Sequence, residues 1–444
     1  MRKVIVVGGG FAGVAAATAL AEKGVQVDLL ESRGSLGGRV YSTDNPSFPA
    51  PFDNGPHLLM GCYHETWKLL KRLGAPDTFH KIDPLNLSWL CPGGQKVSLQ
   101  CAPLPAPLHL VWGLLTTNAF SWKEKVSLTK ALLLFSKKPF SLNPEIKTVA
   151  QLLDFTHQGP QARERFWIPL CNAVMNVPVE MAPLAGFGEV LHRVFFGSRK
   201  DSSLVVAGKP LSDIGFKQTP AYLKKQDGAV HFHEGVQSFK VSKDSFEVLT
   251  RLGNTYTGDA LIWAVPPSSL SALWPSDGWE KIKTLPQLGK SPIISVHLIL
   301  SRSLFSEQLA GLSGGRFEWV FNRNANWGWK GGGQYLSLVA SAAEPLAKQT
   351  EKELVDLAVK ELKTRLPTSV TFEVLHAKAT REMAATFIWT EETDRLRLST
   401  ETPYPHVRLA GDWTATGLPA TIEGACLSGH TAAQKTWEHL NQTP

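Results

Sequence analysis

Cysteine is scarce in this sequence, and long apolar runs are absent from it. Five cysteines occur in 444 residues, at positions 62, 91, 101, 171 and 426, and no C-x-x-C pair is present. This spacing predicts neither a disulfide framework nor a zinc site, and it favours a reducing compartment. Because no run of roughly eighteen uninterrupted apolar residues occurs, we expect no membrane-spanning helix.

Charged residues are also few. They make up 19% of the chain, apolar residues make up 43%, and the formal net charge is +7. Such mild basicity suits an anionic ligand or an anionic membrane face without indicating nucleic acid. No RNP, zinc-finger or helix-turn-helix pattern occurs, so we expect no nucleic-acid partner. A strand is predicted from Lys3 onwards, which leaves no room for a signal peptide and favours a cytoplasmic protein.

The first forty residues carry the most specific pattern. A β-branched run at 3–7 predicts a buried strand, an Ala/Leu-rich run at 14–23 predicts a helix, and a second strand is predicted at 25–30. Between the first strand and the helix the glycines have G-x-G-x-x-G spacing, and Glu31 follows the second strand. This order of elements is typical of a dinucleotide-binding fold.

Each residue type in this pattern has a mechanical reason. Gly8 permits a tight turn, Gly10 lets a pyrophosphate approach the backbone, and Gly13 lets the helix pack closely on the strand. Unpaired N–H groups at the start of the helix would bind the phosphates, and Glu31 would accept hydrogen bonds from ribose hydroxyls. The contacts predicted here are Gly8, Gly10, Phe11, Ala12, Gly13, Glu31 and Ser32.

The following segment distinguishes FAD from NAD. Glu31 leads within a few residues to Gly37-Gly38-Arg39. This motif resembles the second signature of the amine oxidase and phytoene desaturase flavoproteins. The resemblance implies that Gly37, Gly38 and Arg39 surround the diphosphate and the ribityl chain of FAD. A glycine-rich surface loop with one stray arginine is the alternative.

Further segments resemble flavin-binding elements of the same superfamily. A D-x-G-x-H-like segment at 53–57 implies that backbone approaches the flavin ring, although an Asn-Gly turn alone would explain it. The strand and turn at 407–413 resemble the C-terminal FAD motif, and the next helix would point its positive end at the flavin. Lys378 resembles, in position, a lysine that holds a flavin-bound water. The resemblance implies cofactor contacts at Gly55, Pro56, His57, Leu58, Val236, Gly411, Asp412, Thr421 and Ile422.

The predicted fold class is α/β. It comprises a Rossmann-like FAD-binding domain of the amine oxidase and phytoene desaturase type, with an inserted α+β substrate domain. The FAD-binding domain is discontinuous and is assigned to residues 1–85, 226–285 and 386–444. The substrate-binding domain is assigned to residues 86–225 and 286–385, and it contains possible membrane-facing helices.

One segment of the substrate domain has the character of a membrane-binding surface. Residues 108–120 are largely apolar, and a capping box of Ser121 and Glu124 opens a helix predicted to end near Ser136. A basic amphipathic helix can lie on an anionic bilayer, which would place the protein on the inner face of the cytoplasmic membrane. A core helix with a solvated lysine face is the alternative, and both stay open. The lysines of this helix and its end are Lys123, Lys125, Lys130, Lys137 and Lys138.

Within the superfamily, one branch matches best. Residues 52–63, 89–92 and 167–176 resemble the hydroxysqualene dehydroxylases, also called squalene-associated FAD-dependent desaturases, of squalene and hopanoid synthesis. The resemblance implies that the allylic alcohol hydroxysqualene loses its hydroxyl and receives hydride from reduced FAD, which gives squalene. The apolar run at 166–176 would then line an isoprenoid tunnel, with ordinary core packing as the alternative.

This reaction requires an acid that protonates the leaving hydroxyl, and a buried carboxyl with a raised pKa would suit it. The sequence does not choose among the candidate acids Asp213, Glu180, Glu189 and His297.

Three other functions fit parts of this pattern. The rivals are a carotenoid-type desaturase, an amine oxidase with Trp413 in an aromatic cage, and a prenyl-chain escort protein that is not an enzyme. The intact glycine-arginine and Gly-Asp-Trp motifs argue against the escort protein. His231 and His233 are expected on one face of a strand, but no third ligand is evident and no metal site is predicted.

Overall fold

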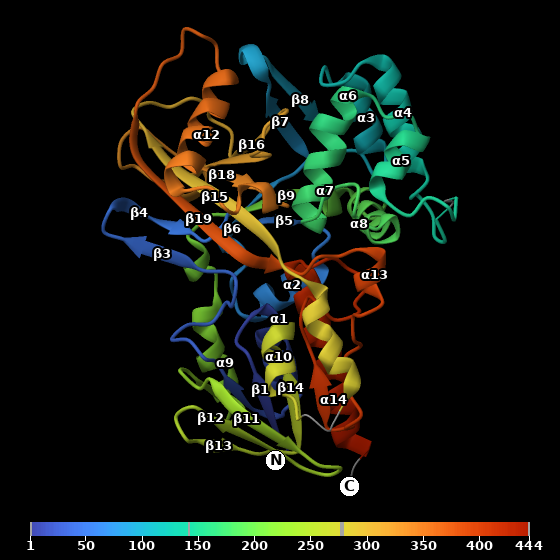
Figure 1. Cartoon of the computed structure of the whole chain (residues 1–444), viewed down its shortest axis with the longest axis vertical. Helices are drawn as coiled ribbons and strands as arrows, with labels where there is room; N and C mark the ends of the chain where they lie inside the picture. The colour runs from blue at the N-terminus through green and yellow to red at the C-terminus, as the bar shows by residue number, and fades with distance from the viewer. Residues whose placement is uncertain (1, 141–142, 276–278, 443–444) are drawn as a thin grey trace.

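A parallel sheet of five strands lies in the lower part of the molecule in Figure 1, where the N- and C-termini also lie. The computed structural model describes residues 2–140, 143–275 and 279–442. The order of the strands in the sheet is β10-β2-β1-β14-β20, and every neighbouring pair is parallel. Its strands are β1 (Lys3–Val7), β2 (Gln26–Leu30), β10 (Ala229–His231), β14 (Ala260–Trp263) and β20 (Val407–Leu409).

Two helices from opposite ends of the sequence cover this sheet. The helix α1 (Phe11–Glu22) is buried from Phe11 to Ala21, and it packs against α14 (Ile422–Gln442). A Cβ added to Gly429 would lie 2.2 Å from the carbonyl oxygen of Ala12, so these helices touch backbone to backbone. The helix α2 (His64–Arg72) packs beside them, and α9 (Thr219–Lys224) and α10 (Pro267–Leu273) complete this part.

A second sheet of seven strands forms the upper part of the molecule in Figure 1. Its order is β19-β15-β18-β17-β16-β7-β8, and α12 (Glu351–Thr364) covers one of its faces with leucines and an alanine. The strands are β7 (Asn86–Leu90), β8 (Lys96–Gln100), β15 (Ser291–Leu300), β16 (Leu309–Leu312), β17 (Trp319–Asn322), β18 (Gln334–Ala340) and β19 (Val374–Thr386).

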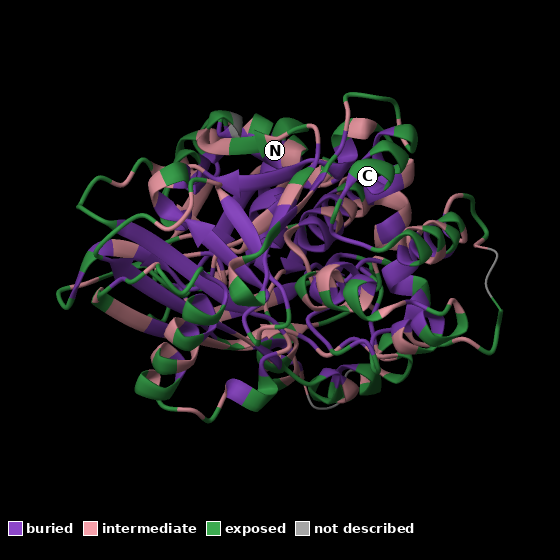
Figure 2. Ribbon diagram, turned by 90° about the horizontal axis from the view of Figure 1, so that it is seen from above, coloured by how far each residue is buried: buried purple, intermediate pink, exposed green. Residues whose placement is uncertain are grey.

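A group of helices stands beside the seven-stranded sheet (Figure 1). In Figure 2 the strands are mostly buried, whereas the outer faces of the helices are exposed. The helices are α3 (Leu108–Thr116), α4 (Trp122–Leu133), α5 (Val149–Phe155), α6 (Pro160–Ala162), a π-helix (Arg163–Trp167), α7 (Ile168–Met175) and α8 (Leu184–Phe196).

Small sheets and short helices complete the structure. The antiparallel pair β3 (Ser42–Asn45) and β4 (Phe48–Asp53) is one, and β11 (Val236–Val241), β12 (Phe246–Thr250) and β13 (Thr255–Tyr256) form another. A third sheet joins β5 (Leu58–Met60), β9 (Leu204–Ala207) and β6 (Phe79–Ile82). The short helices are α11 (Arg323–Trp327), α13 (Glu391–Asp394) and the 3₁₀ turns Pro76–Thr78, Pro92–Gly94, Arg199–Ser202, Leu211–Asp213, Phe216–Gln218, Glu280–Leu288 and Glu344–Leu346.

The α/β fold class is confirmed. The predicted capping box at Ser121 forms, although its helix ends at Leu133 rather than near Ser136. The expectation for His233 is wrong, because β10 ends at His231 and His233 has a left-handed φ of 63° in a turn. The proposed domain bounds stay a prediction, since the sheet β5-β9-β6 takes strands from both sides of them.

Candidate functional site

Three glycines after β1 have different reasons to be glycine. A Cβ on Gly8, whose φ is +107°, would lie 2.4 Å from the carbonyl oxygen of Ala264, and one on Gly13 would lie 1.8 Å from that of Gly8. For Gly10 the nearest atom would be 3.9 Å away, at Gly38. The protein's own packing therefore requires Gly8 and Gly13, whereas Gly10 leaves room that a phosphate at the start of α1 would use.

A second glycine loop lies directly against the first. The N–H of Gly37 donates to the carbonyl oxygen of Gly9 at 2.9 Å, and a Cβ on Gly38 would lie 3.2 Å from the Cα of Gly10. Gly37 and Gly38 have φ values of 122° and 62°, a region that favours glycine. We call these two loops, Gly8–Gly13 and Gly37–Arg39, the glycine cradle.

The carboxylate of Glu31 holds the first loop of the glycine cradle in place. Its carboxylate accepts hydrogen bonds from the N–H of Gly9 at 2.7 Å, the N–H of Arg33 at 2.8 Å and the hydroxyl of Ser32 at 3.1 Å. A carboxylate offers about four acceptor positions, so one remains for a ribose hydroxyl. The main chain of Glu31 also accepts the N–H of Glu234 at 2.8 Å, which places Val236 nearby at the start of β11.

Arg39 joins three distant segments. Its guanidinium pairs with the carboxylate of Asp412 at 2.7 Å and donates to the carbonyl oxygen of Ala385, at the end of β19, at 2.7 Å. The charge of Asp412 raises the pKa of Arg39, so this arginine stays cationic. The side chain of Arg39 is 41% exposed, whereas that of Asp412 is 8% exposed, so the cation remains available to a diphosphate.

The segment at 53–58 is clamped between Arg39 and the seven-stranded sheet. The amide of Asn54 donates to the carbonyl oxygen of Arg39 at 2.8 Å, and the hydroxyl of Thr380 on β19 donates to that of Asn54 at 2.8 Å. A Cβ on Gly55 would lie 3.3 Å from the hydroxyl of Ser295. His57 contacts the carbonyl oxygen of Gly55 at 2.8 Å, and burial lowers its pKa.

Asp53 anchors the start of this segment. It forms an ion pair with Arg323 at 2.9 Å in which both side chains are buried, 0% and 2% exposed. Its second oxygen accepts the hydroxyl of Ser42 at 2.7 Å and the N–H of Leu211 at 3.0 Å. Arg323 also donates to the hydroxyl of Ser337 on β18 at 3.0 Å. The seven-stranded sheet and the segment at 53–58 therefore share one polar network.

The C-terminal motif closes the site from the other side. Gly411, with a φ of 150°, donates to the hydroxyl of Ser428 at 2.8 Å, and Trp413 donates to the carbonyl oxygen of Val265 at 3.0 Å. Because Trp413 is 2% exposed, it offers no open ring face for an aromatic cage. Thr421 and Ile422 stand at the start of α14, where the free N–H groups carry partial positive charge.

An apolar pocket lies beside the start of α14. Burial raises the pKa of the Cys62 thiol there to about 12, so the pocket holds no thiolate at neutral pH. Val174 belongs to the run at 166–176 that was predicted to line a tunnel, and both it and Thr421 line this pocket. The lining residues are Cys62, Tyr63, Val174, Val190, Arg193, Leu418, Pro419, Thr421 and Glu423.

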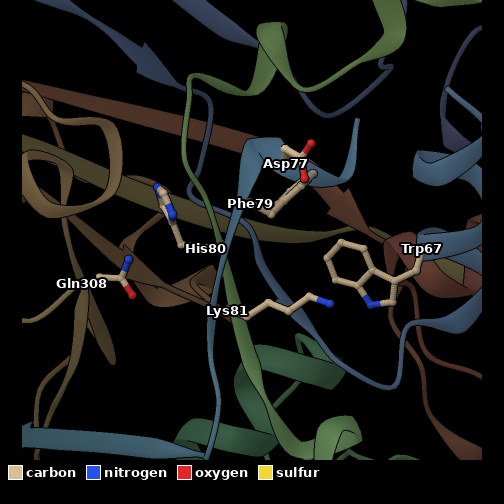
Figure 3. A pocket seen from close by; sticks show the side chains of 6 residues that line it. All are labelled: Trp67, Asp77, Phe79, His80, Lys81 and Gln308. Carbon is tan, nitrogen blue, oxygen red and sulfur yellow. The ribbon is translucent and has the colours of Figure 1, made fainter. Parts of the chain in front are cut away.

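A larger depression opens elsewhere, beside β6 (Figure 3). Lys81 lies 5.0 Å above the ring of Trp67, whose indole donates to the carbonyl oxygen of Met60 at 3.1 Å. Its lining is mainly polar, and none of the predicted cofactor residues contributes to it. This depression therefore suits an apolar substrate less well than the pocket at α14. The lining residues are Trp67, Asp77, Phe79, His80, Lys81 and Gln308.

None of the four predicted acids meets the requirement of a buried group that holds a proton. Asp213 is exposed and pairs with Lys217 at 2.5 Å, and Glu180 is exposed. Glu189 is bound by Arg193 at 2.7 Å and by Lys138, and these cations lower its pKa against the effect of burial. His297 is fully buried, and burial lowers its pKa to about 3, so its ring is neutral.

Lys378 does not join the predicted flavin contacts. Its ammonium pairs with Glu351 of α12 at 3.2 Å. The residues of β19 that reach the segment at 53–58 are Thr380 and Glu382, whose carboxylate lies 3.4 Å from the amide of Asn54. Sequence reasoning missed both, although counting in twos along the strand from Lys378 would have found them.

The described residues contain neither a metal-binding cluster nor a membrane-spanning helix. No three of their His, Cys, Asp and Glu side chains gather as a metal site would require, and His231 instead contacts Asp28 at 3.1 Å. No helix in the described ranges has both the length and the apolar character needed to cross a bilayer.

Together these features define a dinucleotide-binding flavoprotein fold, with the glycine cradle at the start of α1, Glu31 after β2 and the Gly411-Asp412 turn before α14. The family described as flavin containing amine oxidoreductase matches residues 11–436, and the chain belongs to that family. The protein is therefore an FAD-dependent oxidoreductase.

Curated relatives narrow the comparison. The chain is 29% identical to a hydroxysqualene dehydroxylase of Rhodopseudomonas palustris, covering 97% of both chains, and 26% identical to one of Zymomonas mobilis, covering 98% and 99%. This confirms the resemblance to that branch. The chain is also 23% identical to the 15-cis-phytoene desaturase of Arabidopsis thaliana, over 97% of this chain and 79% of the relative. A solved putrescine oxidase has the same fold, with a TM-score of 0.69 at 15% identity over 98% and 99% of the two chains.

The residues present fit FAD. Gly10 leaves space at the helix start, Arg39 offers a partly free guanidinium, and Glu31 keeps an acceptor position. We expect the cradle to bind the diphosphate, Glu31 the ribose and Asp412 the ribityl end, with the segment at 55–58 and the start of α14 beside the ring. These assignments stay predictions for each residue.

Proposed function

We propose that this protein is a hydroxysqualene dehydroxylase that converts hydroxysqualene to squalene. The observation that carries the proposal is the similarity of nearly the whole chain to two curated hydroxysqualene dehydroxylases of similar length. A small apolar pocket of about 20 Å³, lined in part by Val174 of α7 and Thr421, lies beside the expected flavin edge. A triterpene substrate of squalene and hopanoid synthesis follows from the proposal.

The chain's own groups suit a reductive reaction on an apolar substrate. Bound FAD, once reduced, supplies hydride. The positive end of α14 would stabilise negative charge on the pyrimidine edge of the reduced cofactor. The half-buried side chains of Ile168, Leu170 and Val174 on α7 would exclude water, so that a carbon losing its hydroxyl meets hydride before solvent.

A carotenoid-type desaturase is the second candidate, because phytoene desaturases also cover nearly the whole chain. The two candidates differ in the direction of electron flow. An anaerobic single turnover separates them: prereduced protein mixed with hydroxysqualene should be reoxidised and yield squalene. Deuterium placed on the flavin should appear on the carbon that lost its hydroxyl. Inert reduced protein, together with desaturation of phytoene or squalene by the oxidised protein, would establish the desaturase instead.

We further propose that an anionic bilayer is a partner, and that the protein is cytoplasmic and peripheral on the inner face of the membrane. On α3, Leu108, Val111, Trp112 and Leu115 are exposed, at the spacing of one helix face. Most exposed large apolar side chains of the described residues lie in or near this helix group. We call the following residues the α3–α4 face: Leu104, Leu108, Val111, Trp112, Leu115, Trp122, Val126 and Leu133.

Charge complements this apolar face. Lys123, Lys130 and Lys137 are exposed around it, whereas Lys125 donates to the carbonyl oxygen of Leu115 and ties α4 to α3. Exposed tryptophans and leucines beside free lysines are the composition of an interfacial helix. Exposed apolar side chains gathered along one helix face generally mark a contact site. A bilayer would also be the source of an apolar substrate.

A further inference from the structure

A buried carboxyl lies against α7, whose residues the sequence predicted to form an apolar wall. Glu318 immediately precedes β17 and is 8% exposed. Its main-chain N–H donates to Val339 at 3.0 Å, and its carbonyl oxygen accepts the N–H of Leu312 at 2.8 Å. The residue is therefore fixed between β16 and β18, and its side chain has little freedom to reach solvent.

Two neutral groups, and no cation of the described chain, hold the carboxyl of Glu318. One oxygen accepts the amide of Asn172 on α7 at 2.9 Å, and the other accepts the N–H of Ser341 at 3.0 Å. Burial raises the pKa of Glu318 to about 7 because these two bonds only partly offset desolvation. Among the carboxyls of the described residues whose pKa is clearly shifted, the others are lowered.

Asn172 has an unfilled position beside this carboxyl. Its amide oxygen is buried and accepts no hydrogen bond from the protein, although buried carbonyl oxygens nearly always find a donor. An alcohol could donate to this oxygen and accept from a protonated Glu318. Both halves of a hydroxyl site are thus present on adjoining side chains.

The helix α7 also connects the Glu318 region to the expected cofactor site. Asn176, at the left-handed end of α7, accepts the N–H of Ala342 at 2.6 Å and donates to the hydroxyl of Thr386 at 2.9 Å. Ala342 directly follows Ser341, which binds Glu318. Thr386 directly follows Ala385, which binds Arg39. Glu318 and Arg39 are therefore held against the same end of the seven-stranded sheet.

We propose that Glu318 is the acid that protonates the departing hydroxyl and that Asn172 orients that hydroxyl, which rests on the dehydroxylase function proposed above. The C–O bond breaks with its electron pair on oxygen, and that oxygen takes the proton of Glu318 and leaves as water. The carbon takes the hydride that reduced FAD supplies, and FAD is oxidised by two electrons. Glu318 then recovers its proton from solvent.

Infrared titration of the flavin-loaded protein tests the proton independently of turnover. The carbonyl band of a protonated buried carboxyl should titrate near pH 7 and disappear in Glu318→Gln. It should persist in Glu361→Gln, a matched control whose buried carboxyl binds the N–H groups of Arg316 and Phe317 at 2.7 and 3.2 Å. Asn172→Leu removes one bond to the charged form and should move the midpoint upward. An unchanged band in Glu318→Gln would overturn the assignment.

Single-turnover rates test the role in chemistry. With prereduced flavin, Glu318→Gln should slow squalene formation about 100-fold or more while flavin content stays at the wild-type level. Because the protonated acid reacts, the wild-type rate should fall as pH rises above about 7, and this fall should vanish in the variant. An equal rate in Glu318→Gln rejects Glu318 and leaves the dehydroxylase function standing. A wild-type protein that never converts hydroxysqualene rejects the function itself, whatever the infrared result.

Discussion

The glycine cradle and the surroundings of Glu318 differ in the atoms that make them. In the cradle, the two loops meet through backbone atoms, as in the hydrogen bond from Gly37 to Gly9, and Gly10 has no side chain where a phosphate would lie. Around Glu318, which precedes β17, its carboxyl meets the side chain of Asn172 on α7 and the backbone N–H of Ser341 after β18. The cradle is thus sensitive to added volume, and the Glu318 region is sensitive to changes of charge and polarity.

The largest expected effect comes from adding volume to the cradle. Gly10→Val should give a folded protein without flavin, because its added atoms enter space that the chain leaves open. Gly13→Ala should instead destabilise the fold by about 3 kcal/mol or more, since its Cβ would overlap the backbone of Gly8. Flavin absorbance and the thermal unfolding of the apoproteins distinguish the two outcomes. Full flavin content in Gly10→Val would contradict this distinction.

An effect on stability rather than on flavin binding is expected from removing one charge of the buried ion pair between Asp53 and Arg323. Arg323→Met leaves Asp53 buried without its cation, which should lower the free energy of unfolding by about 3–5 kcal/mol. The matched control, Arg395→Met, breaks an exposed pair with Glu391 and should cost roughly 0–1 kcal/mol. Denaturant unfolding measures both. Equal losses would show that burial of the pair does not matter.

The smallest expected effect concerns the α3–α4 face. Binding to vesicles of anionic and zwitterionic phospholipid should weaken by about 1 kcal/mol for each of Lys123, Lys130 and Lys137 changed to Glu, and it should weaken with salt. Trp112→Ser should weaken binding at every salt concentration, because it removes buried apolar area rather than charge. Lys240→Glu, far along the chain on β11, is the control. If vesicle binding is the same in all of these variants, the α3–α4 face does not bind the bilayer.

The parts of the site that the sequence could predict are those built from neighbouring residues. The cradle, Glu31 and the Gly411-Asp412 turn depend on backbone geometry within a few positions, so spacing alone identifies them. The acid could not be found in this way. The pKa of Glu318 depends on Asn172, on Ser341 and on the depth of the sheet between them, and these meet only in the folded chain.

Other differences have similar causes. Lys378 was assigned by its resemblance, in position, to a lysine of the superfamily, but its side chain pairs with Glu351 on the helix that covers the sheet. The exposure of α3 could not be read from its residues, because apolar side chains occur on both its buried and its exposed faces. The ion pair of Arg39 with Asp412 was likewise hidden, since each residue was assigned to the cofactor separately.

That ion pair has a consequence for synthesis of the protein. Arg39 leaves the ribosome early, whereas Asp412 and the start of α14 emerge only after both intervening sheets have been translated. Until residue 412 emerges, Arg39 lacks the carboxylate that it pairs with in the folded chain. Because Arg39 and Asp412 are both predicted to contact FAD, we expect flavin binding to be a late event that is completed only after residue 412 has been translated.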